Sequence, residues 1–96
     1  MDARKPKPPI VEIIETLHAA REVCIGYEKK YNMLSEQFFE LYSQGLLDDD
    51  GLNYDFVDWA GSYKTVLECQ REYNNQVKQS TPTEKITHLK AHAVVT

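Results

Sequence analysis

Apolar residues recur at alternating steps of three and four positions along two separate stretches of this 96-residue chain. That spacing follows one face of an α-helix, which completes a turn in about 3.6 residues. The first stripe follows two prolines that suit the opening of a helix and comprises Ile10, Ile13, Leu17, Ala20, Cys24, Tyr27 and Tyr31. The second comprises Leu52, Phe56, Trp59, Tyr63, Val66, Gln70, Tyr73 and Val77. Two long amphipathic helices of similar length are therefore expected to bury these stripes against each other.

A shorter helix is predicted between the two long ones, over roughly residues 35–44. Ser35 is a plausible N-cap, because its hydroxyl can accept from a free backbone N–H of the next turn. Gly45 is a stop signal, and Asn53 and Asp55 suit the start of the next helix. The fold class predicted is all-α, an antiparallel helical hairpin of two long helices with a short capping helix between them.

The two ends of the chain differ from the predicted helical domain at 9–79. Residues 1–8 are basic and rich in proline, so we expect a flexible leader. Residues 80–96 form a tail in which Thr81 and Glu84 match a capping box around Pro82. The apolar side of that segment is thin, so a short C-terminal helix is expected to form only against a partner or not at all.

Composition excludes several classes of protein. The apolar runs fall far short of the roughly 20 residues that cross a bilayer, and no apolar signal core follows the leader, so we expect a cytoplasmic protein with no membrane contact. Two cysteines, Cys24 and Cys69, are too few for a disulfide framework. The net charge of −4 removes the long-range attraction to phosphate, so nucleic acid is not an expected partner.

The candidate chemical motifs are all weak, so the sequence predicts no enzyme, no cofactor and no metal site. Glu15 and His18 have the Glu-x-x-His spacing of di-iron bundles, but the second copy and the further carboxylates that such a centre needs are missing. His88 and His92 lie four apart and favour at most adventitious metal binding. The run from Asp48 to Gly51 resembles the start of a calcium loop without its closing glutamate.

One segment combines acidic and aromatic residues in an unusual way. From Leu34 to Tyr63 the chain has seven acidic residues, seven aromatic residues and no lysine or arginine. One interpretation is that the rings are core and the acids are a solvated rim. The other is an acidic, aromatic docking face for a basic protein, because aromatic residues dominate binding hot spots and complementary charge speeds encounter. The residues predicted to bind the partner are Phe39, Asp48, Asp49, Asp50, Tyr54, Asp55 and Asp58.

The same segment carries a family resemblance over about the middle 40 residues of the chain. Its residues are Tyr31, Met33, Ser35, Phe38, Phe39, Tyr42, Gly45, Leu47, Asp55, Phe56, Trp59 and Tyr63. This pattern resembles small prokaryotic helical-hairpin proteins that are encoded beside toxin genes and act as antitoxins. The resemblance implies a non-enzymatic, antitoxin-like neutraliser of a basic toxin. The alternative is a self-associating scaffold, a homo-oligomer whose Tyr- and Trp-bearing stripes assemble two or more copies.

Overall fold

The computed structural model describes residues 8–47 and 53–93, and every regular element within them is an α-helix. The helices are α1 (Ile10–Tyr31), α2 (Ser35–Ser43), α3 (Tyr54–Val77) and α4 (Pro82–Ala93). The prediction of an all-α protein is confirmed. The predicted basic leader, apart from Pro8, and the predicted binding residues Asp48, Asp49 and Asp50 lie outside the described residues.

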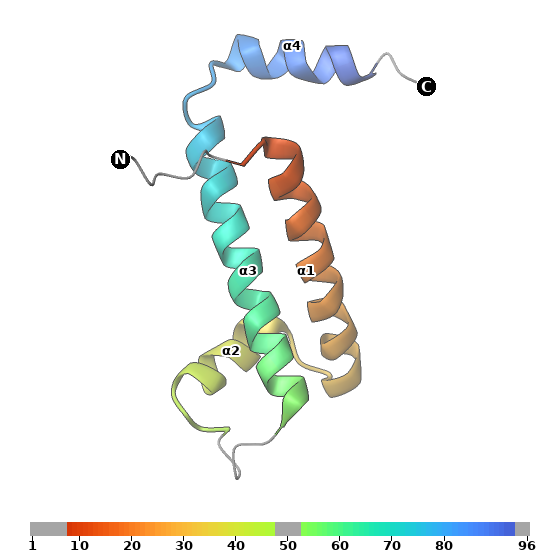
Figure 1. Ribbon diagram of the computed structural model, residues 1–96, viewed down its shortest axis with the longest axis vertical. Helices are drawn as coiled ribbons and strands as arrows, with labels where there is room; N and C mark the ends of the chain where they lie inside the picture. The colour runs from red at the N-terminus through yellow and green to blue at the C-terminus, as the bar shows by residue number, and fades with distance from the viewer. Residues whose placement is uncertain (1–7, 48–52, 94–96) are drawn as a thin grey trace, which may run out of the picture.

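The two long helices lie side by side and run in opposite directions (Figure 1). Their apolar stripes meet, so that Ile13 and Cys24 of α1 and Trp59 and Val66 of α3 are each at most 6% exposed. Six more of the predicted stripe residues pack against the buried cluster, namely Leu17, Ala20, Tyr27, Tyr31, Phe56 and Tyr63. Two predicted stripe residues, Ile10 and Gln70, are exposed. The spacing therefore identified the faces that the helices turn towards each other.

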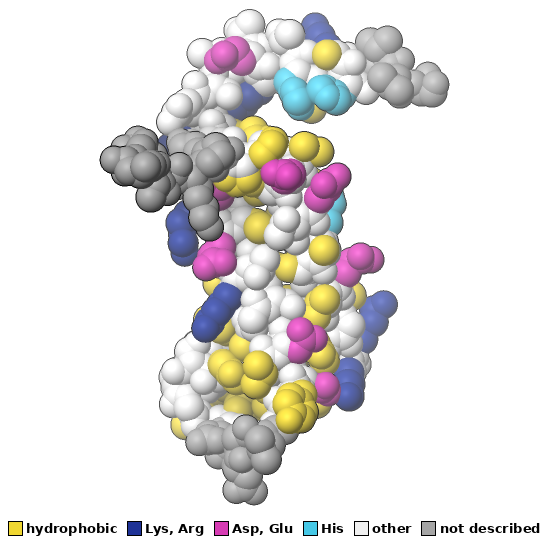
Figure 2. Space-filling view, in the orientation of Figure 1, with side chains coloured by type: hydrophobic (Ala, Val, Ile, Leu, Met, Phe, Trp, Pro, Cys, Tyr) yellow, Lys and Arg dark blue, Asp and Glu magenta, His cyan; other side chains and the backbone are white. Residues whose placement is uncertain are grey.

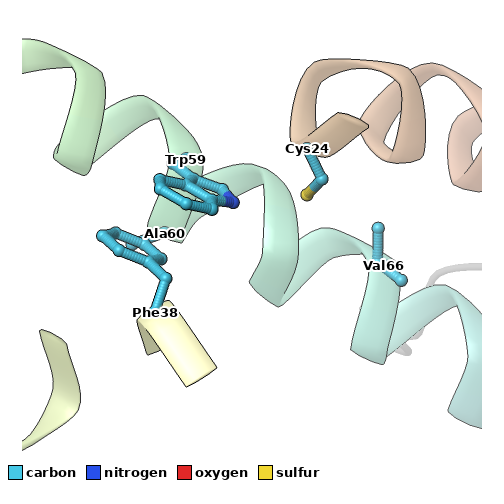
Figure 3. Close-up of a cluster of buried hydrophobic side chains, with 5 residues drawn as sticks. All are labelled: Cys24, Phe38, Trp59, Ala60 and Val66. Atoms are coloured by element: carbon cyan, nitrogen blue, oxygen red, sulfur yellow. The ribbon is translucent and has the colours of Figure 1, made fainter. Parts of the chain in front are cut away.

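The short helix α2 lies against α3 at the lower end of the pair (Figure 1). Phe38 is its anchor, being 1% exposed, and its ring stacks on Trp59 with centroids 3.8 Å apart and planes 2° from parallel. Figure 3 shows these two rings face to face, with Cys24 of α1 on the other side of Trp59. All three helices thus contribute to one buried cluster.

Residues with positive φ end α1 and α2. Asn32 has φ 54° and ψ 43°, a left-handed conformation that asparagine tolerates better than most residues. Gly45 has φ 73°, and the Leu46 N–H donates to the Leu41 carbonyl oxygen at 3.1 Å, as in a Schellman motif. The predicted stop at Gly45 is confirmed, and both residues turn the chain sharply after a helix.

Side-chain caps open the last two helices where the sequence predicts them. The Asn53 side chain accepts from the Phe56 N–H at 3.3 Å at the start of α3. At α4, the Glu84 N–H donates to the Thr81 hydroxyl at 3.1 Å, and the Thr81 N–H donates to the Glu84 carboxylate at 2.7 Å. This reciprocal pair is the predicted capping box.

The C-terminal helix α4 forms without packing on the hairpin. None of its residues is buried, and Figure 1 shows it extending away from the upper end of α3. Among the described residues, none of the helices has both the length and the apolar character that crossing a membrane requires.

Candidate protein-binding site

A buried serine links α1, α2 and α3. Ser35 is 4% exposed, and its hydroxyl donates to the Glu28 carboxylate of α1 at 2.7 Å. The same hydroxyl accepts from the Trp59 indole N–H of α3 at 2.8 Å. The Ser35 backbone N–H also donates to Glu28, at 2.9 Å. The buried side-chain N and O atoms of this cluster therefore all have hydrogen-bond partners within the protein.

The predicted N-cap role of Ser35 is wrong. Leu34 is the N-cap of α2 and makes no side-chain cap, and Ser35 is the first residue inside the helix. Glu28 of the neighbouring helix α1 caps α2 instead, because its carboxylate accepts a hydrogen bond from the free backbone N–H of Ser35. Sequence reasoning missed this link, although Glu28 lies four residues after Cys24 and hence beside the buried stripe of α1. A carboxylate at such a position needs a partner, and that is the signal.

Two tyrosine–aspartate hydrogen bonds join α1 to the first turns of α3. The Tyr27 hydroxyl donates to Asp58 at 2.7 Å, and the Tyr31 hydroxyl donates to Asp55 at 2.6 Å. The bond to Asp58 raises the pKa of Tyr27 to about 12, because it stabilises the protonated phenol beside a carboxylate.

A salt bridge reinforces the second of these bonds. Lys30 of α1 pairs with the carboxylate of Asp55, and this pairing is the largest cause of a lowered pKa for Asp55. Tyr31, which donates to the same carboxylate, lowers that pKa further. Asp55 and Asp58 were predicted to bind a partner, and in the structure each binds α1 of its own chain.

Most of the aromatic residues in the acidic segment belong to the core. Phe38 and Trp59 are buried, and four more pack against the buried cluster, namely Phe39, Tyr42, Phe56 and Tyr63. Phe39, a predicted binding residue, is half-buried, and its ring lies 5.3 Å from that of Tyr63 between centroids. For these six rings the interpretation as core is the correct one.

Tyr54 is the exception among the seven aromatic residues. It is 81% exposed at the first position of α3, and Val57, one turn later on the same face, is 57% exposed. Of the predicted binding residues that the structure describes, Tyr54 therefore has by far the most ring surface open to a partner. Its position follows directly from the Asn53 cap, which sets where α3 begins.

The described residues offer little for catalysis. Burial raises the pKa of the thiols of both Cys24 and Cys69, so neither is activated as a thiolate nucleophile. No group of three or more His, Cys, Asp or Glu side chains in residues 8–47 and 53–93 has the geometry to hold a metal ion. His88 and His92 lie close together, with ring centroids 4.2 Å apart, on the exposed helix α4.

Family models, curated proteins and solved structures were each compared with the chain, and none of them matches. The resemblance to antitoxin-like proteins has no support from these comparisons and stays a prediction.

Proposed function

We propose that this chain is a non-enzymatic, cytoplasmic protein-binding module, an antiparallel helical hairpin closed at one end by α2. Its task is to bind and neutralise a basic protein partner in the manner of an antitoxin. The observation that carries the proposal is the exposure of Tyr54, 81%, on a segment whose other six aromatic side chains pack in or against the core.

The exposed face of α3 has the composition of a binding hot spot. Tyrosine is enriched at such sites because its ring supplies apolar contact area while its hydroxyl forms a directed hydrogen bond. Val57 extends the apolar surface by one helical turn. A partner that covers both side chains would remove from water an apolar patch that the chain's own fold leaves open.

Charge supports a basic partner. The segment from Leu34 to Tyr63 has no lysine or arginine, and Lys30 of α1 is engaged by Asp55. Glu36 and Glu40 of α2 are exposed at the same end of the hairpin. Acidic groups around an apolar anchor favour encounter with a cationic surface and disfavour an acidic one.

The surface is also held rigidly before a partner arrives. The first turns of α3 are tied to α1 by the bonds from Tyr31 to Asp55 and from Tyr27 to Asp58. Trp59, one turn further on, is bonded to Ser35 of α2. Binding to a surface that is already ordered loses less conformational entropy than binding to one that orders on contact.

The experiment is co-expression with the product of the neighbouring gene, followed by co-purification and measurement of association and dissociation rates. We expect a basic protein to co-purify and Tyr54→Ala to speed its dissociation about tenfold or more, since hot-spot truncations cost roughly 2 kcal/mol. Val57→Ala should weaken binding less. Val11→Ala is the matched control, because Val11 of α1 is 59% exposed and Val57 is 57% exposed.

Two results would count against the proposal. One is that no basic protein co-purifies, and the other is that Tyr54→Ala and Val11→Ala bind alike. Either would favour the alternative, a self-associating scaffold without a toxin partner. Trp59 and the stripes around it are buried within one chain, so such a scaffold must use other surfaces than those stripes. The unpacked helix α4 is the observation that favours this second candidate.

A further inference from the structure

The helix α4 has an apolar stripe of the kind that packs against another surface, but the described part of its own chain does not bury it. It has 12 residues, none of them buried, and isolated helices of this length are marginal in water. Ile86 is 51% exposed and Leu89 is 66% exposed. A complete capping box starts the helix, so its sequence is built for the helical state.

The side chains of α4 are arranged around one apolar stripe. Ile86, Leu89 and Ala93 share a face, at steps of three and four residues. At 100° per residue, Lys85 and Lys90 lie on opposite sides of that stripe, each about 70° from its centre. Glu84, the only acidic residue of α4, lies on the opposite face of the helix. The apolar stripe therefore has a positive charge along each edge.

A groove with the complementary pattern runs between α1 and α3 near their upper end. Cys69, half-buried, supplies apolar surface in it, and the buried Ile13 lies beneath. Acidic residues line both sides, Glu12 and Glu15 from α1 and Glu68 and Glu72 from α3, together with one cation, Arg71. Figure 2 shows hydrophobic side chains at this end of the hairpin, below α4, with acidic side chains beside them.

We propose that α4 of a second copy of this chain occupies this groove, and that the two copies exchange their C-terminal helices in a symmetric dimer. The apolar stripe of α4 covers Cys69, and its two lysines each face one acidic edge. The formal charge of α4 is +1 with neutral histidines, from two lysines and Glu84, and that of the groove is −3, from four glutamates and Arg71.

The connection between α3 and α4 favours exchange over packing within one chain. Lys78 continues in the right-handed helical conformation, with its N–H donating to the Asn74 carbonyl oxygen at 3.0 Å. Among the described residues, positive φ occurs only at Asn32 and Gly45, the two places where the chain turns sharply after a helix. The linker at 78–81 has no glycine or asparagine, so it lacks the residues that most readily form such a reversal.

The test is a charge exchange between full-length variants, read by analytical ultracentrifugation up to roughly 100 μM, where even a weak dimer is populated. Lys85→Glu with Lys90→Glu reverses the charge along both edges of α4. Glu15→Lys with Glu68→Lys reverses the charge of one residue on each side of the groove. We expect the parent to be dimeric and each double variant to dissociate about tenfold or more readily. An equimolar mixture of the two double variants should form a heterodimer, because each reversed surface then meets a reversed partner. Glu22→Lys with Glu40→Lys is the control for the same change in charge at exposed positions outside the groove.

Three outcomes would overturn the proposal. A monomeric parent whose α4 amides are protected from hydrogen exchange would mean that α4 packs on its own hairpin. A monomeric parent with unprotected α4 amides would mean that no partner copy binds it. A dimer that survives both double variants would use another surface. The exchange does not depend on the proposed binding of a basic protein through Tyr54 at the other end of the hairpin, so each proposal can fail without the other.

Discussion

Replacing Ser35 with alanine tests whether the buried hydroxyl holds the three helices together. The substitution removes one oxygen atom and leaves the backbone N–H of residue 35 bonded to Glu28. It deletes the donor to Glu28 at 2.7 Å and the acceptor of the Trp59 indole N–H at 2.8 Å. Because Trp59 is 1% exposed, water cannot readily replace that acceptor.

The expected loss of stability follows from these two bonds. A buried N–H left without an acceptor costs about 1–3 kcal/mol. Glu28 is only half-buried and keeps one protein donor, so loss of the hydroxyl there adds about 0.5–1 kcal/mol. We therefore expect Ser35→Ala to lower the free energy of unfolding by about 2–3 kcal/mol, a large share of the roughly 5–15 kcal/mol typical of a domain.

The assay is urea unfolding followed by far-ultraviolet circular dichroism, with Ser43→Ala as the matched control. Ser43 is the last residue of the same helix and is exposed, so its replacement should change stability by less than about 0.5 kcal/mol. Repeating Ser35→Ala in a Trp59→Phe background, which has no indole N–H, should reduce its cost by about 1 kcal/mol or more.

Two results would refute the reasoning about Ser35. If Ser35→Ala costs no more than Ser43→Ala, the hydroxyl contributes nothing that water cannot replace. If the cost of Ser35→Ala is the same with tryptophan and with phenylalanine at position 59, the bond between Ser35 and Trp59 is not its origin.

Two further predictions concern the core and the tyrosine–aspartate bonds. Trp59→Ala should lower the free energy of unfolding by about 3–5 kcal/mol in urea, because the 1% exposed ring leaves a cavity beside Phe38; a change below about 0.5 kcal/mol would contradict its place in the core. Tyr27 has a folded-state pKa raised to about 12, so its contribution to stability is fully present below the unfolded value of about 10 and is lost as the pH rises towards the folded value. The difference in unfolding free energy between the parent and Tyr27→Phe should thus be constant up to about pH 10 and shrink above it. A difference that grows with pH would contradict this prediction.

The sequence by itself determined the helices and most of their ends, although not the N-cap of α2. The stripes of α1 and α3 identified the faces that pack, and the Asn53 cap, the stop at Gly45 and the box of Thr81 with Glu84 are in place. These features depend on residues within about one helical turn of each other, because caps and i, i+4 neighbours are local. Local chemistry was therefore enough to predict them.

Only the tertiary structure decided what the acidic aromatic segment does. The composition from Leu34 to Tyr63 is the same whether a ring faces the core or water, and the rotation of each helix about its axis separates buried Trp59 from exposed Tyr54. Likewise, Asp55 and Asp58 pair with tyrosines that are 24 and 31 positions away in the sequence. No local pattern encodes such pairs, since they exist only once α1 and α3 have set their distance and register. The packing of the helices, not their composition, thus left Tyr54 and α4 exposed in the part of the chain that the structure describes.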